Sequence, residues 1–517
     1  MNGSRTYKSF KNSTVAIAAQ LLSILLSFIT RTFFIKYLGV EFLGINGLFI
    51  NILTILSLAE LGVGTAIVYS MYKPIAEGNE IKIAALMNLY KKLYISIGLF
   101  IGLVGISIIP FLEIMVKGNT EVSNLERLYI LYLANTVISY FFTFKRSIII
   151  ANQYGYLNKL NIILFSIIQN ILQIFLLVLT SNIYLYLVTQ ILCTLLSNIF
   201  ISIKANKMYP YLKKYKKAKV DNEEKREISK NIIAMMSHKL GSVVVSGTDN
   251  LLISAYVGIA SVGLYSNYVL ISNTLKAVTL QGIEAITASV GNLTAIGSKE
   301  HSYEIFKKVY FINFVTTFYS VVFLYVFINP FIIIWIGEKY LLSQQIVLMI
   351  VINFYVVQMR QPSIVYINSY GLFWKIKWKS LVEAVFNLFI SLILVSVFNM
   401  GIFGILIGTL LSNMVTNVWW EPFVVFKYGF NKSILSYYKT YVVDSLICII
   451  TMITVDKVAG ILIENLILNF TISSILVTLI LMVVYGRREE FKFSLSLIKS
   501  ILKTIFNKIA ASKNKSQ

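Results

Sequence analysis

Charged residues are scarce in this chain: they make up 13% of its 517 residues, against about 25% in ordinary soluble domains. A soluble protein of this length needs more polar side chains to cover its surface, so a soluble enzyme is excluded. Hydrophobic residues make up 57% of the chain, and the mean hydropathy is +0.76. The apolar residues fall in long runs, which is typical of a protein with many membrane-spanning helices.

Cysteine and histidine are almost absent. Cys193 and Cys448 lie inside apolar runs, and neither has the spacing of a metal site or a disulfide framework. His238 and His301 are too far apart in the chain to indicate a site. The motif G-x-x-x-x-G-K-[ST] is missing as well, which excludes ATP hydrolysis by that route. The sequence therefore predicts neither a metal nor a cofactor.

Fourteen apolar runs are long enough to cross a membrane, which takes a helix of about 20 residues. The sequence thus predicts an all-α polytopic membrane protein with about 14 transmembrane helices. The runs lie near residues 14–38, 43–71, 91–116, 125–150, 157–180, 183–204, 231–257, 260–297, 305–336, 342–368, 376–399, 402–426, 436–460 and 463–486.

Positive charge is in excess, with 46 Lys and Arg against 23 Asp and Glu, a net charge of +23. On a soluble protein this would indicate nucleic acid, but here it tests the orientation, because cytoplasmic loops of membrane proteins are rich in Lys and Arg. With fourteen spans, 38 basic residues fall on the side of both termini, 5 on the other side and 3 within spans. This predicts a multi-pass protein of the cell membrane, with both termini cytoplasmic and no nucleic-acid partner.

Two basic segments lie outside the predicted spans. Residues 205–230 form the longest loop, a cytoplasmic linker that contains KKYKKAK at 213–219. Residues 487–517 form a tail whose apolar residues have helical spacing, with lysines elsewhere. This pattern predicts a basic amphipathic helix on an anionic inner leaflet. A docking site for a partner is the alternative interpretation of the tail.

The two halves of the chain resemble each other at three places, and the matching segments are separated by nearly the same distance along the chain each time. The matches are YLGVEFLGI at 37–45 with YVGIASVGL at 256–264, NQYG at 152–155 with NSYG at 368–371, and TLLSN at 194–198 with TLLSN at 409–413. Spans one to six therefore correspond to spans seven to twelve, in the same orientation.

Parallel repeats of this kind are typical of transporters, with the substrate path between the lobes. The repeat predicts an N-lobe at 1–204 and a C-lobe at 231–426, each of six helices. Two C-terminal helices at 427–486 lie outside the repeat. The predicted outer loops are short and hold no acidic pair at a membrane face, which argues against a membrane polymerase or glycosyltransferase. The chain is predicted to be no enzyme.

Residues 31–79 carry a resemblance to a known family. Arg31 in the first helix is followed by the pattern YLG-x-x-x-[LF]-G, and the second helix ends in L-x-x-x-x-LG-x-G-x-A at 56–66. This segment resembles the start of polysaccharide-unit flippases of the Wzx type (O-antigen, capsule and exopolysaccharide). These belong to the MOP (MATE-like) exporter superfamily, which two six-helix lobes plus two extra helices also resemble.

The resemblance implies that the chain flips undecaprenyl-diphosphate-linked oligosaccharide units across the cytoplasmic membrane by alternating access, for polysaccharide biosynthesis. Its partners would be this lipid-linked substrate, membrane lipids, and a separate polymerase with other assembly proteins. Two alternatives from the same superfamily stay open. One is a cation-coupled multidrug exporter, and the other is a lipid II flippase, which should carry more arginines in its first two helices.

Charged side chains within spans are costly, so each one suggests a function. The three basic residues left within spans are Arg31, Lys276 and Arg360. A diphosphate carries about two negative charges and pairs best with arginine forks, so these three are predicted to bind the substrate. For Arg31 and Arg360, snorkelling to the membrane surface is the alternative.

Three acidic residues are predicted to couple transport to an ion or to form ion pairs, because a buried carboxylate can carry a proton. Glu60 lies near the middle of the second span. Asp249 is adjacent to Asn250, which is the repeat equivalent of Arg31. Glu284 lies eight positions after Lys276 and so on nearly the same helix face.

Overall fold

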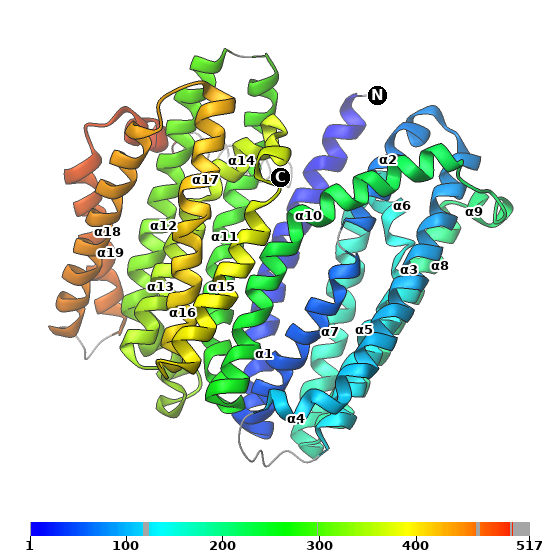
Figure 1. The fold of residues 1–517 in the computed structure, drawn as a ribbon, viewed down its shortest axis with the longest axis horizontal. Helices are drawn as coiled ribbons and strands as arrows, with labels where there is room; N and C mark the ends of the chain where they lie inside the picture. Colours follow the sequence, from blue (N-terminus) through cyan, green and yellow to red (C-terminus); the bar gives the residue numbers. More distant parts are fainter. Residues whose placement is uncertain are drawn as a thin grey trace, which may run out of the picture. The chain divides into compact units, whose positions relative to one another are not determined.

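The fold was determined as a computed structural model. It describes residues 2–60, 62–116, 124–296, 298–461, 466–496 and 499. Within these ranges, residues 2–14, 233–246 and 281–296 and a few single positions are described as backbone alone. The described residues are almost entirely helical and contain no strand, which confirms the predicted all-α class (Figure 1).

Helices occupy all fourteen of the predicted segments in the described part of the chain. Nine helices there are long and apolar enough to cross a membrane by length and composition. The longest of these, Val15–Leu56, covers the first predicted span (14–38) and the first part of the second (43–71), because its two halves join at Gly39 without a loop. The chain is a multi-pass membrane protein.

The helices of the first half are α1 (Asn2–Leu56), α2 (Val63–Glu77), α3 (Glu80–Ile108), α4 (Leu112–Met115), α5 (Leu125–Thr143), α6 (Arg146–Ala151), α7 (Gly155–Thr180), α8 (Ile183–Met208) and α9 (Tyr211–Lys214), with the 3-10 turn η1 (Ser57–Glu60) between α1 and α2. Those that follow are α10 (Asn222–Leu252), α11 (Ile259–Ile296), α12 (Lys299–Trp335), α13 (Gln344–Met359), α14 (Gln361–Tyr370), α15 (Lys379–Ser396), α16 (Gly401–Val415), α17 (Asn417–Val424), α18 (Leu435–Ile461) and α19 (Leu466–Tyr485). The π-helical turns η3 (Ile253–Val257) and η6 (Val425–Phe430) extend α10 and α17.

The chain divides into two compact units by the contacts between its Cα atoms. Unit 1 comprises residues 1–267 and 380–405, and unit 2 comprises residues 268–379 and 406–517. These units are defined by packing, whereas the predicted lobes are defined by the sequence repeat, so the lobe boundaries stay a prediction. In unit 1, α1 packs on α7 and α10, and α8 packs on α5 and α7. In unit 2, α12 packs on α13 and α18, and α18 on α19.

Two glycines from the two halves of the repeat pack against each other's segments within unit 1. A Cβ on Gly44 would overlap the backbone carbonyl of Ile259, and a Cβ on Gly263 would overlap the carbonyl of Val40. When 37–45 is aligned with 256–264, Gly44 falls on Gly263 and Val40 falls on Ile259. The contact is thus reciprocal, as expected for a two-fold related pair of repeats, and it requires glycine because the backbones approach so closely.

The kinks beside this contact are also equivalent. Gly39 lies between the two helical halves of α1 with a φ of 88°, and Gly258 lies between η3 and α11 with a φ of 131°. Both backbone conformations are ones that glycine adopts readily and other residues rarely do. In each half of the repeat, therefore, a glycine ends one helix and redirects the chain into the next.

The C-terminal segment is described only in part. Residues 489–496 are helical, as predicted for the start of the amphipathic tail. The remainder of that predicted helix, beyond residue 499, lies outside the described residues. At the start of the tail, Arg488 lies 4.0 Å from Asp444 of α18, and Tyr485 donates a hydrogen bond of 2.7 Å to the same carboxylate.

Candidate functional site

Arg31 lies in the first half of α1, where its side chain is half-buried. Its Nη1 donates a hydrogen bond of 2.9 Å to Oγ of Ser266, and that hydroxyl donates in turn to the carbonyl of Gly263 at 2.8 Å. Among the residues that the structure describes, no carboxylate forms an ion pair with Arg31. Arg31 therefore keeps its full positive charge within a membrane-spanning helix, with a neutral hydroxyl as its partner.

The neighbours of Arg31 follow the repeat. When the alignment of 37–45 with 256–264 is extended to both sides, Arg31 corresponds to Asn250 and Gly47 corresponds to Ser266. The side-chain amide of Asn250 lies 3.9 Å from the position that a Cβ on Gly47 would take. The two halves thus pair the same positions, but one pair is a cation and a hydroxyl where the other is an amide and a glycine. The charge belongs to the N-terminal half alone.

Glu60 does not lie in the middle of a continuous helix. It ends the 3-10 turn η1 between α1 and α2, and its carboxylate accepts a hydrogen bond from the hydroxyl of Tyr94 on α3. Tyr94 belongs to an aromatic cluster, with ring centroids 4.4 Å from Tyr90 and 5.7 Å from Tyr140. Glu60 is therefore held by a tyrosine, and none of the ion pairs in the described part of the chain includes it.

The other two predicted acidic residues are placed differently. Asp249 is buried on α10, in unit 1 with Arg31. The backbone of Glu284 belongs to α11, but its side chain lies outside the described residues.

Arg360 lies in unit 2 at the junction between α13 and α14, where it meets a carboxylate that sequence reasoning missed. Its Nε and Nη2 donate to the two oxygens of Glu421 on α17, at 2.9 and 2.7 Å. Lys379 Nζ donates to the same carboxylate at 2.6 Å. The side chains of Arg360, Lys379 and Glu421 are only 15%, 7% and 2% exposed. Arg360 is thus neutralised by a bidentate, charge-assisted pair.

Lys276 is the third predicted substrate cation. It lies half-buried on α11 in unit 2, within electrostatic range of Arg360. The role of Lys276 in substrate binding stays a prediction. The sequence signal for Glu421 is an acidic residue inside the twelfth apolar run, at WWEPF.

Arg146, in the first half of the repeat, makes a contact like one that Arg360 makes in the second half. Its Nη2 donates to Asn198 Oδ1 at 2.7 Å, as Arg360 Nη1 donates to Asn413 Oδ1 at 2.9 Å. Asn198 and Asn413 are the last residues of the two TLLSN segments. The repeated asparagine therefore anchors an arginine in each half, a role that the segment match alone does not reveal.

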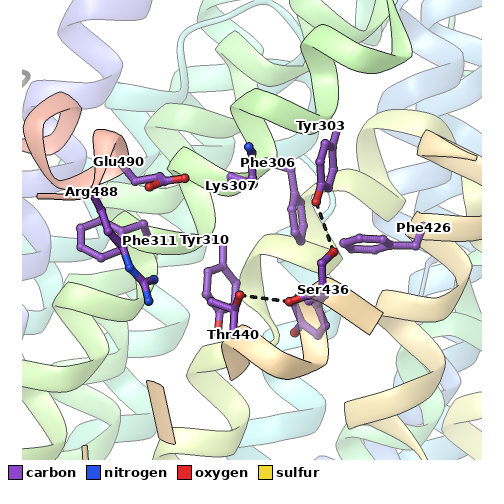
Figure 2. A pocket seen from close by; sticks show the side chains of 11 residues that line it. Tyr303, Phe306, Lys307, Tyr310, Phe311, Phe426, Ser436, Thr440, Arg488 and Glu490 are labelled. Carbon is purple, nitrogen blue, oxygen red and sulfur yellow. Dashed lines mark hydrogen bonds between the residues drawn. The ribbon is translucent and has the colours of Figure 1, made fainter. Parts of the chain in front are cut away.

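Unit 2 also contains an aromatic pocket that the sequence did not predict (Figure 2). It encloses about 150 Å³ and lies between α12, η6, α18 and the segment after α19. Figure 2 shows the ring of Phe306 between those of Tyr310 and Phe426, with Arg488 and Glu490 near each other at one side. Tyr303 and Ser436 join two of its walls by a hydrogen bond of 3.4 Å.

Several solved structures of membrane transporters share this fold. An inward-closed lipid II flippase MurJ matches with a TM-score of 0.66 at 14% identity, over 92% of this chain and 99% of that one. An inward-facing multidrug resistance MATE family transporter of the MOP superfamily matches with a TM-score of 0.62 at 17% identity, over 80% and 98%. A MOP superfamily transporter from Pyrococcus furiosus gives 0.58 at 16% identity, over 83% and 97%. These identities establish a shared fold.

The chain shares its fold with solved membrane transporters of the MOP superfamily. The chain belongs to the family described as polysaccharide biosynthesis protein, whose sequence model matches residues 9–285, more than half of its length. This confirms the resemblance of the N-terminal segment to polysaccharide-unit flippases. A search of curated proteins found no match.

Proposed function

We propose that the protein flips an undecaprenyl-diphosphate-linked oligosaccharide unit from the inner to the outer leaflet of the cytoplasmic membrane, by alternating access. It performs no covalent chemistry. Both termini face the cytoplasm, and a separate polymerase uses the flipped unit on the outer face. Membership in a polysaccharide biosynthesis family and a flippase-like fold support this proposal.

The observation that carries the proposal is the charge on Arg31. A cation that is half-buried in a membrane span, with no carboxylate partner among the described residues, is unfavourable, so a chain keeps one where an anion arrives. Ser266 orients the guanidinium through one nitrogen, at 2.9 Å, and leaves its other N–H groups for a phosphate. A substrate that carries a diphosphate fits a transporter whose charged binding group is an arginine.

Replacing Arg31 tests the proposal. In a strain that lacks its own flippase, we expect Arg31→Ala to lower polymer yield at least about tenfold, because a charge-assisted hydrogen bond contributes about 1.5–3 kcal/mol. Arg31→Lys should restore part of the yield, since it keeps the charge without the fork. Lys36→Ala is the matched control: it removes one positive charge from an exposed position on the same helix.

The substrate is identified by what accumulates. Undecaprenyl-diphosphate-linked units should build up in the inner leaflet of the Arg31→Ala strain, at an amount of membrane-inserted protein equal to wild type. Normal polymer yield with Arg31→Ala would refute the role of this arginine. If lipid II accumulates, or if only resistance to organic cations changes, the lipid II flippase or the multidrug exporter replaces the proposed function.

A further inference from the structure

Positive charge gathers at the predicted cytoplasmic end of unit 1. Lys145 stands in the turn between α5 and α6, and its Nζ donates to Oδ1 of Asn206 on α8 at 3.0 Å. Lys91, Lys213 and Lys216 lie within electrostatic range of Lys145. We call these four residues, Lys91, Lys145, Lys213 and Lys216, the lysine cluster.

Two members of the lysine cluster come from the linker, and the linker is fixed in place. The side-chain amide of Asn88 on α3 donates to the backbone carbonyls of Tyr215, Lys216 and Ala218, at 3.2, 3.1 and 3.0 Å. Helix α9, which contains Lys213, packs on α3 as well. These contacts fix the backbone that carries Lys213 and Lys216 within electrostatic range of Lys145.

The lysine cluster has no acidic partner among the residues that the structure describes. The ion pairs there include none of the four lysines, and the linker's Glu224 pairs with Lys82 at 3.2 Å. Asn206 satisfies Lys145 with an amide oxygen, which leaves its charge intact. Like charges held close together cost free energy, so an arrangement of this kind is suited to an anion.

The second half of the repeat has an acidic residue at the position of Asn206. When the two TLLSN segments are aligned and the alignment is extended toward the C-terminus, Asn206 corresponds to Glu421. Glu421 neutralises Arg360 and Lys379 in unit 2. The C-terminal half thus carries a carboxylate at the position where the N-terminal half carries a neutral amide. The charge of the lysine cluster is a property of one half only, so it is not required by the shared fold.

We propose that the lysine cluster is a binding site for the phosphate groups of a membrane lipid, and that its ligand is the diphosphate of the lipid-linked substrate before translocation. Ammonium groups on flexible stems act as point charges that suit the several oxygens of a diphosphate. The inference rests on the proposed function, because it adds a cytoplasmic docking step to the path of the same substrate. The other source of this chemistry is bulk anionic lipid.

A matched pair of substitutions at Asn206 tests the charge of the site. Asn206→Glu copies the other half of the repeat and places a carboxylate beside Lys145, whereas Asn206→Gln keeps a neutral amide. Binding of undecaprenyl diphosphate to the purified full-length chain in detergent should weaken at least about tenfold with Asn206→Glu and change less than about threefold with Asn206→Gln, since only the carboxylate opposes an anionic lipid. Equal effects of the two substitutions would overturn the proposal.

A second variant removes charge without touching Asn206. The triple substitution Lys145→Gln, Lys213→Gln and Lys216→Gln should weaken binding of undecaprenyl diphosphate by at least about tenfold. The matched control neutralises three exposed lysines on the same predicted side, Lys73, Lys159 and Lys230, and should leave binding within about threefold of wild type. Equal loss in both triple variants would show a general charge effect and no site.

The ligand's source is decided by competition. Phosphatidylglycerol should displace undecaprenyl diphosphate only at a large excess, and phosphatidylcholine should not displace it. If phosphatidylglycerol competes at equal concentration, the site belongs to bulk anionic lipid and the substrate assignment is wrong. The binding result is independent of transport. If the wild-type chain complements a flippase-deficient strain, but the Asn206→Glu variant binds undecaprenyl diphosphate as tightly as wild type, the docking site is refuted and the proposed function stands. Failure of wild-type complementation refutes the function itself.

Discussion

Gly44 packs directly against the backbone carbonyl of Ile259, and this contact has a counterpart between Gly263 and Val40. The four residues form two pairs that the alignment of the repeats superimposes, so one contact is the other after exchange of the two halves. Backbones can approach this closely only where a residue has no Cβ. The YLG-x-x-x-[LF]-G pattern therefore has a physical reason in this chain: its last glycine is the contact surface between equivalent segments.

Gly44→Ala should destabilise the protein by about 1–3 kcal/mol, because the added methyl group forces two backbone segments apart. Gly263→Ala should cost a similar amount for the same reason. The double variant should cost less than the sum, since the two sites are adjacent and the first substitution already opens the contact. Thermal unfolding of the purified chain in detergent measures all three.

Gly460→Ala is the control for this series, because nothing lies within 4 Å of the position that its Cβ would take. It should be neutral or slightly stabilising, since alanine is the better helix former by about 1 kcal/mol. An equal loss of stability with Gly44→Ala and Gly460→Ala would contradict the close-approach explanation.

Glu421→Gln should destabilise the protein by about 3–5 kcal/mol, because it leaves the buried side chains of Arg360 and Lys379 without this shared carboxylate. The loss should appear as a lower amount of folded protein in the membrane and a lower unfolding temperature. The control is Glu300→Gln, whose carboxylate pairs with Lys432 at 2.6 Å but is 66% exposed. Breaking that surface pair should cost at most about 1 kcal/mol. A reversed order of the two effects would contradict this account.

Tyr94→Phe should destabilise the protein by about 1–3 kcal/mol, because it removes the hydroxyl that donates a hydrogen bond to the Glu60 carboxylate. Tyr129→Phe is a closely matched control in the same unit. Its hydroxyl is buried and has no hydrogen-bond partner among the described residues, so its removal should be neutral or stabilising. Urea unfolding followed by intrinsic fluorescence separates the two. Equal losses would indicate that Tyr94 contributes through ring packing alone.

The predicted orientation can be checked with single cysteines, because both native cysteines are buried. A membrane-impermeant maleimide added to intact cells should label Glu338→Cys, which lies at an exposed position in a predicted outer loop. The same reagent should label Lys217→Cys, in the linker, only after the cells are permeabilised. The opposite labelling pattern would show that the positive-inside assignment is wrong.

Much of this protein could be predicted because the membrane imposes simple rules. Long apolar runs must be helical, since a backbone in lipid has to satisfy its own hydrogen bonds. The repeat was visible because the same contacts require the same residue types in both halves. Examples are the close-packed glycines Gly44 and Gly263 and the arginine-binding asparagines Asn198 and Asn413. Residues 31–79 likewise indicated the family that the match over residues 9–285 establishes.

The partners of the charged residues could not be predicted. Glu60 and Arg31 both stand out as charges within spans, but their hydrogen-bond partners, Tyr94 and Ser266, lie 34 and 235 residues away. Arg360 looked like a cation available to the substrate, whereas the fold places it on Glu421, 61 residues further on. Which charged side chains form ion pairs depends on the distances between them in the folded chain, and the order of apolar runs in the sequence does not give these distances.

The class of structure follows from the amino-acid sequence alone. Insertion into a membrane and orientation there depend on hydrophobicity, on the length of the apolar runs and on the distribution of Lys and Arg. Which charges stay available is settled only by the folded chain. In the folded chain Arg31 donates to the hydroxyl of Ser266, and Arg360 pairs with the carboxylate of Glu421. Lys145 donates to the neutral amide of Asn206, at the position where the other half of the repeat has Glu421. The physical reason is that the cost or value of a buried charge depends on the groups within a few ångströms of it, and only folding brings those groups there.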